Sequence, residues 1–312
     1  ATRGPSLTLS DEAAKHAIYA LVGLAIMFIL SRLDYHFLES FAALFYAGCL
    51  ALLGLVFALG ITNYGSQRWL NLGFFQLQPS EIAKLSLIVI LAKVYSNHSG
   101  ELHKAKWFIL AGIITAVPAA VVFIQPDLGT AIMLVAIFGG MTIGAKVGTR
   151  ILATAGVLAI PALFVFWNWV MQDYQRARLL IFLDPYSDAS GAGYNMIQSR
   201  TAIGGGGWFG QGYMNGSQSQ LEFLKVQYSD FIVSVVGEEF GFVGLIALIA
   251  LLFIVVWRCL VVAARARDGF GSLIAVGVAT WIGVQVFINV GMNIGLMPGT
   301  GIPMRFISYG GS

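Results

Sequence analysis

The sequence predicts an all-α membrane protein, a polytopic bundle of transmembrane helices with one large extracytoplasmic loop. Three observations point to this fold class. Hydrophobic residues make up 58% of the 312 residues and charged residues only 11%, whereas soluble domains carry about 25% charged residues. Apolar runs recur that are long enough for a bilayer, which needs roughly 20 residues per helix. One long hydrophilic stretch, residues 172–229, interrupts these runs.

About eight apolar runs fit transmembrane helices by this measure, and we expect residues 1–312 to form a single integral membrane domain. The runs cover approximately residues 16–31, 37–60, 80–95, 106–124, 128–145, 150–171, 230–256 and 271–297. Their apolar residues are continuous and do not alternate with polar ones, which favours helices over the strands of a membrane barrel.

The placement of the cations orients the predicted bundle. Lysine and arginine are dense in the short loops on one side, near Arg32 and within residues 93–106, 146–150 and 258–267. Short basic loops usually face the cytoplasm, so we expect the 172–229 loop to be extracytoplasmic. The net charge of +3 is too small to indicate a polyanion as partner, and nucleic acid is not expected.

Asp230 stands where the hydrophilic stretch ends and the seventh apolar run begins. Its carboxylate is expected at the lip of a membrane span, beneath a loop able to fold over it. It either caps the helix or takes part in chemistry on a lipid-anchored, charged substrate. Glu238 and Glu239 follow about two turns deeper, where at least one must pair within the bundle. For these two, a structural partner is expected.

A second group of polar residues is expected on the same side of the membrane. In Gln78-Pro-Ser-Glu-Ile-Ala-Lys84, Ser80 suits a helix N-cap, and the i,i+3 spacing puts Glu81 and Lys84 on one helix face. The two form either a local ion pair or a functional site, because charges inside membrane helices are costly and usually functional.

Two further residues join this group through the topology. Asp127 lies in a tight connection between two spans, where it is expected to cap the next helix and also to orient a cation. Arg68 precedes Trp69 in an outer loop. It is either an interfacial anchor or a phosphate ligand, since a guanidinium matches phosphate oxygens in a bidentate way.

Two familiar binding motifs are missing from the chain. The glycine run 204–207 follows no strand and precedes no Gly-Lys-Ser/Thr, so the nucleotide-binding loop is absent. A flexible, close-packed loop is expected instead. No His-x-x-x-His or Cys-x-x-Cys pattern occurs, which argues against a zinc site.

Seven short motifs resemble those of the SEDS family (shape, elongation, division and sporulation), and they occur in family order over essentially the whole chain. The string before Asp230 is more similar to elongation members than to division members. One departure is Lys225-Val-Gln-Tyr-Ser-Asp230, where the family typically has Pro-Glu-x-His-Thr-Asp. The motifs are Gly65-Ser-Gln-Arg-Trp-Leu, Gln78-Pro-Ser-Glu-Ile-Ala-Lys84, Gln125-Pro-Asp-Leu-Gly-Thr130, Gly193-Tyr-Asn-Met-Ile-Gln-Ser199, Gly216-Ser-Gln-Ser-Gln-Leu-Glu-Phe223, Ser229-Asp-Phe-Ile and Ser308-Tyr-Gly-Gly-Ser312.

The resemblance implies a fold of ten transmembrane helices, of which this chain would lack the first and the last. It implies a peptidoglycan glycosyltransferase in the bacterial inner membrane that polymerises lipid II, the undecaprenyl-pyrophosphate-linked disaccharide-pentapeptide, on the extracytoplasmic side. A class B penicillin-binding protein and the elongation machinery are the implied partners. The alternatives are a lipid II flippase, a division-type polymerase and a scaffold without catalytic activity.

The resemblance also assigns roles to individual residues. Asp230 corresponds to the essential acid and is the candidate catalytic base. The implied substrate-binding residues are Lys84 with Glu81 beside it, the loop arginine Arg68, Asp127 and Ser308. A divalent cation, Mg²⁺ or Mn²⁺, could bridge the substrate pyrophosphate to a carboxylate, because hard cations favour oxygen ligands. The sequence contains no complete set of metal ligands.

Overall fold

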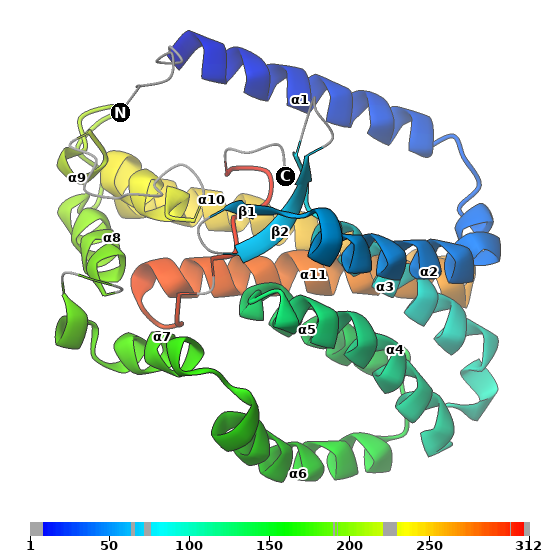
Figure 1. The fold of residues 1–312 in the computed structure, drawn as a ribbon. Helices are drawn as coiled ribbons and strands as arrows, with labels where there is room; N and C mark the ends of the chain where they lie inside the picture. Colours follow the sequence, from blue (N-terminus) through cyan, green and yellow to red (C-terminus); the bar gives the residue numbers. More distant parts are fainter. Residues whose placement is uncertain are drawn as a thin grey trace.

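The chain folds into a helical bundle in the computed structural model, which describes residues 9–63, 66–71, 76–189, 191, 193–220, 230–299 and 301–308. Each of the eight predicted apolar runs corresponds to one long helix (Figure 1). These helices are α1 (Leu9–Leu30), α2 (His36–Leu59), α3 (Pro79–Asn97), α4 (Ala105–Ile124), α5 (Leu128–Gly144), α6 (Thr149–Val165), α10 (Ile232–Arg265) and α11 (Gly269–Ile294).

Five helices in the described part of the chain are long and apolar enough to cross a membrane. They are α2, α4, α6 together with the π turn Phe166–Val170, α10 and α11. A chain with this many apolar helices is a multi-pass membrane protein, and the predicted helical fold class is confirmed. The total of eight spans stays a prediction, because α3 carries three charged residues and α5 has 17 residues.

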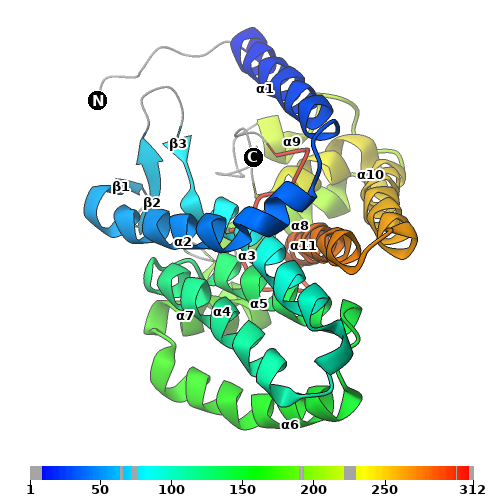
Figure 2. The same cartoon turned by 90° about the vertical axis from the view of Figure 1, so that its right-hand side faces the viewer.

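Helices α3, α5 and α11 form the centre of the bundle. α3 packs against α2, α4, α5 and α11, while α11 also packs against α10 and α8. α3 has a charged N-terminal turn, yet its side chains from Leu87 to Ala92 are all buried. α1 and α6 lie at opposite outer edges of the molecule in both views (Figures 1 and 2). Most of their apolar side chains are exposed, as expected for helices that face lipid.

The hydrophilic stretch 172–229 contains helices in its described part. These are α7 (Asp173–Leu183), the short 3-10 helix η3 (Pro185–Asp188), α8 (Tyr194–Gly205) and α9 (Ser217–Gln220). A small antiparallel sheet of β1 (Ile61–Asn63), β2 (Ser66–Asn71) and β3 (Gln76–Leu77) connects α2 to α3. The sequence did not predict this sheet, because its strands are too short to show an alternating pattern.

The short basic loops gather at one end of the bundle, which we call the basic end. The loops before α4 and before α6 meet there, with the Gly148 amide donating to the Leu102 carbonyl at 3.3 Å. The loops before α2 and before α11 meet through Tyr35 and Asp268. The opposite end, here called the site end, holds the N-terminus of α3, the N-terminus of α10 and the C-terminus of α11.

The glycine run 204–207 is packed closely against α10 as predicted, but Gly204 and Gly205 end helix α8 and do not belong to a loop. α10 is interrupted at Gly241, which has a φ of 67°. There the Phe242 amide donates to the Gly207 carbonyl at 2.9 Å. A Cβ at Gly206 would lie 2.0 Å from the Gly237 carbonyl oxygen, and one at Gly210 would lie 2.1 Å from that of Glu239. Only glycine allows the backbones to approach this closely.

Candidate functional site

Asp230 lies at the site end, two residues before α10, and is partly buried. Two buried amides of α11 fix its backbone. Asn289 Nδ2 and Asn293 Nδ2 donate to the Asp230 carbonyl at 3.2 and 3.1 Å. The amides leave the carboxylate to other partners, and a Cβ at Gly301 would lie 3.8 Å from its Oδ2. The structure therefore holds this acid in a set position beside segment 301–308.

Segment 301–308 is attached to α11 by a ladder of side-chain amides. Asn289 Nδ2 donates to the Ile302 carbonyl at 2.7 Å, so one amide ties this segment to Asp230. Gln285 Nε2, one turn away on α11, donates to the Pro303 carbonyl at 2.6 Å. Segment 301–308 therefore runs along α11 from the neighbourhood of Asp230 to the N-terminus of α3.

Glu81 lies between two cations at the N-terminus of α3. Lys84 Nζ donates to Glu81 Oε1 at 2.5 Å, and Arg305 Nη2 pairs with Glu81 Oε2. Both cations also lie over the indole ring of Trp281 on α11, at 5.2 Å for Lys84 and 4.7 Å for Arg305. The side chain of Lys84 is only 1% exposed, against 17% for Arg305 and 28% for Glu81.

We call the three charged residues, Glu81, Lys84 and Arg305, the ion triad on Trp281. Together with Trp281 they join α3, α11 and segment 301–308. Gly301 and Arg305 are four residues apart, and a fully extended chain of that length spans at most about 14 Å. Asp230 beside Gly301 and the triad at Arg305 therefore belong to one region of the site end. Of the predicted group, Asp230, Glu81 and Lys84 are thus brought together on one side of the bundle, whereas the side chain of Arg68 lies outside the described residues.

Arg305 was not among the residues predicted from the sequence. Its position in a loop after the last apolar run gives no periodic signal. One sequence feature could have pointed to it: Arg305 lies only three residues before Ser308, where one of the family motifs begins. Burial lowers the pKa of Arg305 to about 10, so the guanidinium remains positively charged at neutral pH.

Asp127 has the predicted capping role. Its Oδ1 accepts from the Thr130 amide at 3.1 Å and its Oδ2 from Thr130 Oγ1 at 3.0 Å, at the start of α5. Asp127 also lies within electrostatic reach of Lys84. The carboxylate thus caps a helix and adds negative charge beside the buried ammonium.

One predicted cap was wrong. Ser80 does not cap α3, because the helix begins one residue earlier, at Pro79, and Gln78 occupies the cap position. Proline suits this first helical position, since its missing N–H would have no helical partner there and its φ is already helical.

Ser308 and Arg68 remain predictions as substrate ligands. Ser308 is buried, and its Oγ accepts from the Met304 amide at 2.8 Å, which closes the turn that carries Arg305. The backbone of Arg68 lies in β2, between α2 and α3, while its side chain lies outside the part that the structure describes.

Glu238 and Glu239 have structural partners, as predicted. Glu238 Oε1 accepts from the Gln218 amide at 2.8 Å, and Glu239 Oε1 accepts from the Met214 amide at 3.2 Å. Both carboxylates are buried. They fasten the segment after the glycine run to α10.

The described residues contain no group of three or more His, Cys, Asp or Glu side chains arranged to hold a metal ion. Glu81 is paired with two cations and Asp127 caps a helix. A divalent cation would therefore need substrate oxygens to complete its ligands, and we derive no catalytic step through it.

Comparisons with known proteins agree with this architecture. A family model described as "Cell cycle protein", covering FtsW, RodA and SpoVE, matches residues 8–312. The peptidoglycan glycosyltransferase MrdB of Escherichia coli K12 is 41% identical over 292 residues, which cover 93% of this chain and 78% of that protein. The probable peptidoglycan glycosyltransferase FtsW of Geobacter metallireducens is 38% identical and covers 96% and 80%.

Solved structures show the same fold. A chain from a peptidoglycan synthase complex superimposes with a TM-score of 0.81 at 29% identity, covering 96% of this chain and 84% of that one. The rod shape determining protein RodA of Thermus thermophilus gives a TM-score of 0.68 at 26% identity, covering 100% and 83%. The resemblance noted from the motifs is confirmed, and the chain belongs to the family of cell cycle proteins that comprises FtsW, RodA and SpoVE.

Proposed function

We propose that this protein is a peptidoglycan glycosyltransferase that polymerises lipid II during cell elongation. Relatives at 41% and 38% identity are named peptidoglycan glycosyltransferase and probable peptidoglycan glycosyltransferase, and the more similar of these two is MrdB. The observation that supports the site assignment is the amide ladder of α11. It brings the carboxylate-bearing Asp230 and the cationic Arg305 into one region, at the end of a membrane bundle.

In the proposed reaction Asp230 is the general base. The 4-hydroxyl oxygen of the acceptor sugar bonds to the anomeric carbon of the donor, and the carbon–oxygen bond to the lipid pyrophosphate breaks. The electron pair leaves with the pyrophosphate, and the hydroxyl proton passes to the Asp230 carboxylate. Such a base accelerates a reaction by about 10²- to 10⁴-fold. Its fixed backbone, held by Asn289 and Asn293, supports this role because a base must be positioned before it is effective.

Arg305 and Arg68 are the proposed ligands of the departing pyrophosphate. Positive groups placed where charge develops stabilise the transition state. Arg305 has exposed surface and remains paired with Glu81, so the triad can hold it in a set direction. Lys84 is nearly fully buried. We assign it the task of positioning Glu81, and through Glu81 the guanidinium of Arg305.

An apolar cavity of about 840 Å³ supports a lipid-linked substrate. It is lined almost entirely by apolar residues of α4, α5, α6, the π turn and α7, and it reaches Pro298 and Gly299. Pro298 and Gly299 precede segment 301–308, so the cavity approaches that segment. Arg178 is the cation on the wall of the cavity. A polyprenyl chain of the substrate would bury its hydrocarbon in this cavity, at about 25 cal/mol per Å² removed from water.

The orientation follows from the two ends of the bundle. The basic end gathers the short loops rich in lysine and arginine, and such loops face the cytoplasm. We therefore place Asp230 and the site end on the extracytoplasmic side of the bacterial inner membrane. A class B penicillin-binding protein is the proposed partner, supported by the structural match to a chain of a peptidoglycan synthase complex.

A lipid II flippase is the main rival, and it would need polar groups at several depths along a path. Glu238 and Glu239 are the deep carboxylates that could have lined one. Both accept hydrogen bonds from backbone amides of the 206–220 segment, which is a structural use. A purely structural scaffold would leave the convergence of Asp230 and the ion triad without a purpose.

The test uses the whole protein reconstituted in liposomes with fluorescent lipid II, read as glycan ladders on a gel. Asp230→Asn should abolish the ladders while the melting temperature stays close to that of the wild type. Asp173→Asn is the matched control, because Asp173 is a fully exposed acid on α7, and it should leave polymerisation unchanged. Ladders made by Asp230→Asn would disprove the base assignment. If the wild type forms no glycan ladders but moves lipid II across the liposome membrane, the flippase is favoured.

A further inference from the structure

A second cavity, of about 650 Å³, lies at the basic end, away from Asp230 and the ion triad. It opens between the turn that joins α1 to α2 and the C-terminal turns of α10 with the loop that follows. Three arginines line it, Arg258, Arg265 and Arg267, together with Val261 and Val262. The proposed reaction uses none of these residues.

The arginines and valines of α10 form one stripe. Arg258 and Arg265 are seven residues apart, which is about two helical turns, so they point the same way. Val261 and Val262 lie between them on that face. Arg267 follows in the loop. All three arginines are exposed, and none takes part in the ion pairs found among the described residues.

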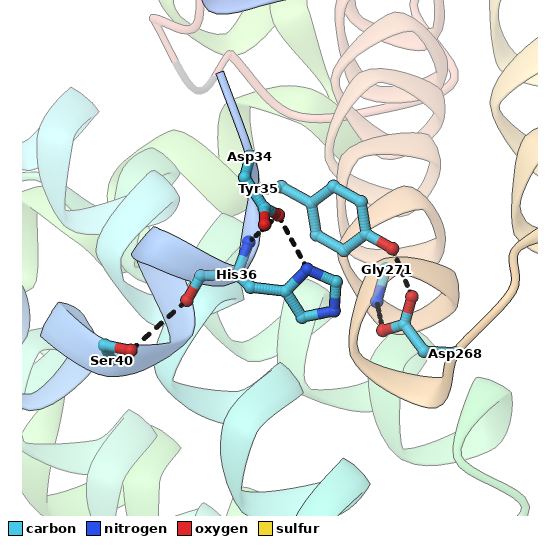
Figure 3. Close-up of polar contacts among 6 residues, drawn as sticks. All are labelled: Asp34, Tyr35, His36, Ser40, Asp268 and Gly271. Carbon is cyan, nitrogen blue, oxygen red and sulfur yellow. Dashed lines mark hydrogen bonds and ion pairs between the residues drawn. The ribbon is translucent and has the colours of Figure 1, made fainter.

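The two acids on the wall of this cavity are already engaged (Figure 3). Asp268 Oδ1 accepts from the Tyr35 hydroxyl and its Oδ2 from the Gly271 amide at 2.8 Å. Asp34 Oδ1 contacts the His36 amide at 2.9 Å and the His36 Nδ1 at 2.6 Å. The hydrogen bond from Tyr35 keeps the pKa of Asp268 below its ordinary value, so the acid remains ionised.

The charges on the cavity wall favour an anion. Three arginines against two aspartates leave an excess of one positive charge. The hydrogen bond to Asp34 raises the pKa of His36, which adds to that excess when it is protonated. A phosphodiester carries one negative charge. Guanidinium groups bind phosphate oxygens in a bidentate way and are less strongly hydrated than an ammonium. The cavity therefore offers three guanidinium groups that can bind one phosphate group.

The apolar residues beside the arginines indicate that the ligand carries a hydrocarbon part as well as a phosphate. Val262 is 56% exposed beside the arginines, and Trp257, five residues earlier on α10 and outside the cavity lining, is 57% exposed. Exposed tryptophan and arginine at the end of an apolar helix are typical of the membrane interface. A free phosphate would leave this apolar surface uncovered. We propose that the cavity at the basic end binds the headgroup phosphate of an anionic phospholipid, with its acyl chains along α10.

The proposal is tested on the whole protein in detergent by native mass spectrometry, with dioleoyl phosphatidylglycerol as the probe. The wild type should bind it at least about tenfold more tightly than dioleoyl phosphatidylcholine, whose choline cation opposes the arginines. Arginines near anionic lipid contribute roughly fivefold each, so Arg258→Gln/Arg265→Gln should weaken binding about 25-fold. Arg265→Lys should lose less, because it keeps the charge and loses only the bidentate geometry.

Arg150→Gln is the matched control, since Arg150 is another exposed arginine at the basic end that does not line the cavity. It should bind phosphatidylglycerol as the wild type does. An equal loss in this control would show a general surface effect and overturn the site. Equal binding of both lipids, unchanged binding by the double glutamine variant, or displacement of the lipid by about 10 mM inorganic phosphate would each overturn the proposal as well.

Discussion

The ion triad on Trp281 gives the sharpest test of the structure, through Glu81→Gln. The substitution keeps the size of the side chain and removes the charge that separates Lys84 from Arg305. Two cations would then face each other over one indole ring, and one of them is only 1% exposed. Breaking a buried ion pair from one side costs about 3–5 kcal/mol. Because Asp127 also lies near Lys84, we expect about 3 kcal/mol.

Thermal unfolding in detergent, followed by tryptophan fluorescence, measures this cost. A change of 1 kcal/mol shifts the melting temperature by about 2–4 °C in proteins of 150–250 residues, so Glu81→Gln should melt about 6–12 °C below the wild type. Glu39→Gln is the control, because Glu39 is a partly buried glutamate on α2 that joins none of the ion pairs among the described residues. It should shift the melting temperature by no more than about 2 °C.

A double variant separates the triad from a general loss of packing. Glu81→Gln/Arg305→Gln removes the second cation as well, so Lys84 no longer faces a like charge. If the three groups interact, the double variant should be at least 0.5–1 kcal/mol more stable than the sum of the two single changes predicts, which is the usual size of coupling between contacting residues. Strict additivity, or a Glu81→Gln variant that melts with the wild type, would refute the triad.

Three further predictions concern other parts of the molecule. Gly241→Ala should lower the melting temperature and reduce polymerisation, because φ is positive there and a Cβ would meet backbone, whereas Gly156→Ala in open space should not. The hydrogen bond from Tyr35 lowers the pKa of Asp268 below its ordinary value of 3.8, so the ionised carboxylate stabilises the folded protein at pH values above 3.8 and this stabilisation is lost as the pH falls. Tyr35→Phe removes the hydrogen bond and should therefore reduce the difference in melting temperature between pH 6 and pH 3. Mn²⁺ should bind measurably only with a pyrophosphate substrate present, and tight binding without it would contradict the donor set described here.

Much of the local structure could be predicted from the sequence. The apolar runs defined the eight long helices, because a membrane helix needs a fixed length of apolar residues. The Glu81–Lys84 pair followed from i,i+3 geometry, and the Asp127 cap followed from its place before α5. The Ser80 cap failed at the same local level, since Pro79 starts the helix one residue earlier.

The site depended on contacts that local patterns do not encode. Arg305 reaches Glu81 across more than 200 residues of chain, and Asn289 ties Asp230 to Ile302 only after α10 and α11 have packed. The basic cavity likewise needs the α1–α2 turn beside the end of α10. The sequence by itself determined where the long apolar helices lie and that Asp127 caps α5, because those depend on neighbours along the chain. Tertiary structure alone decided which charges from remote segments meet, because helix packing sets the distances between those segments.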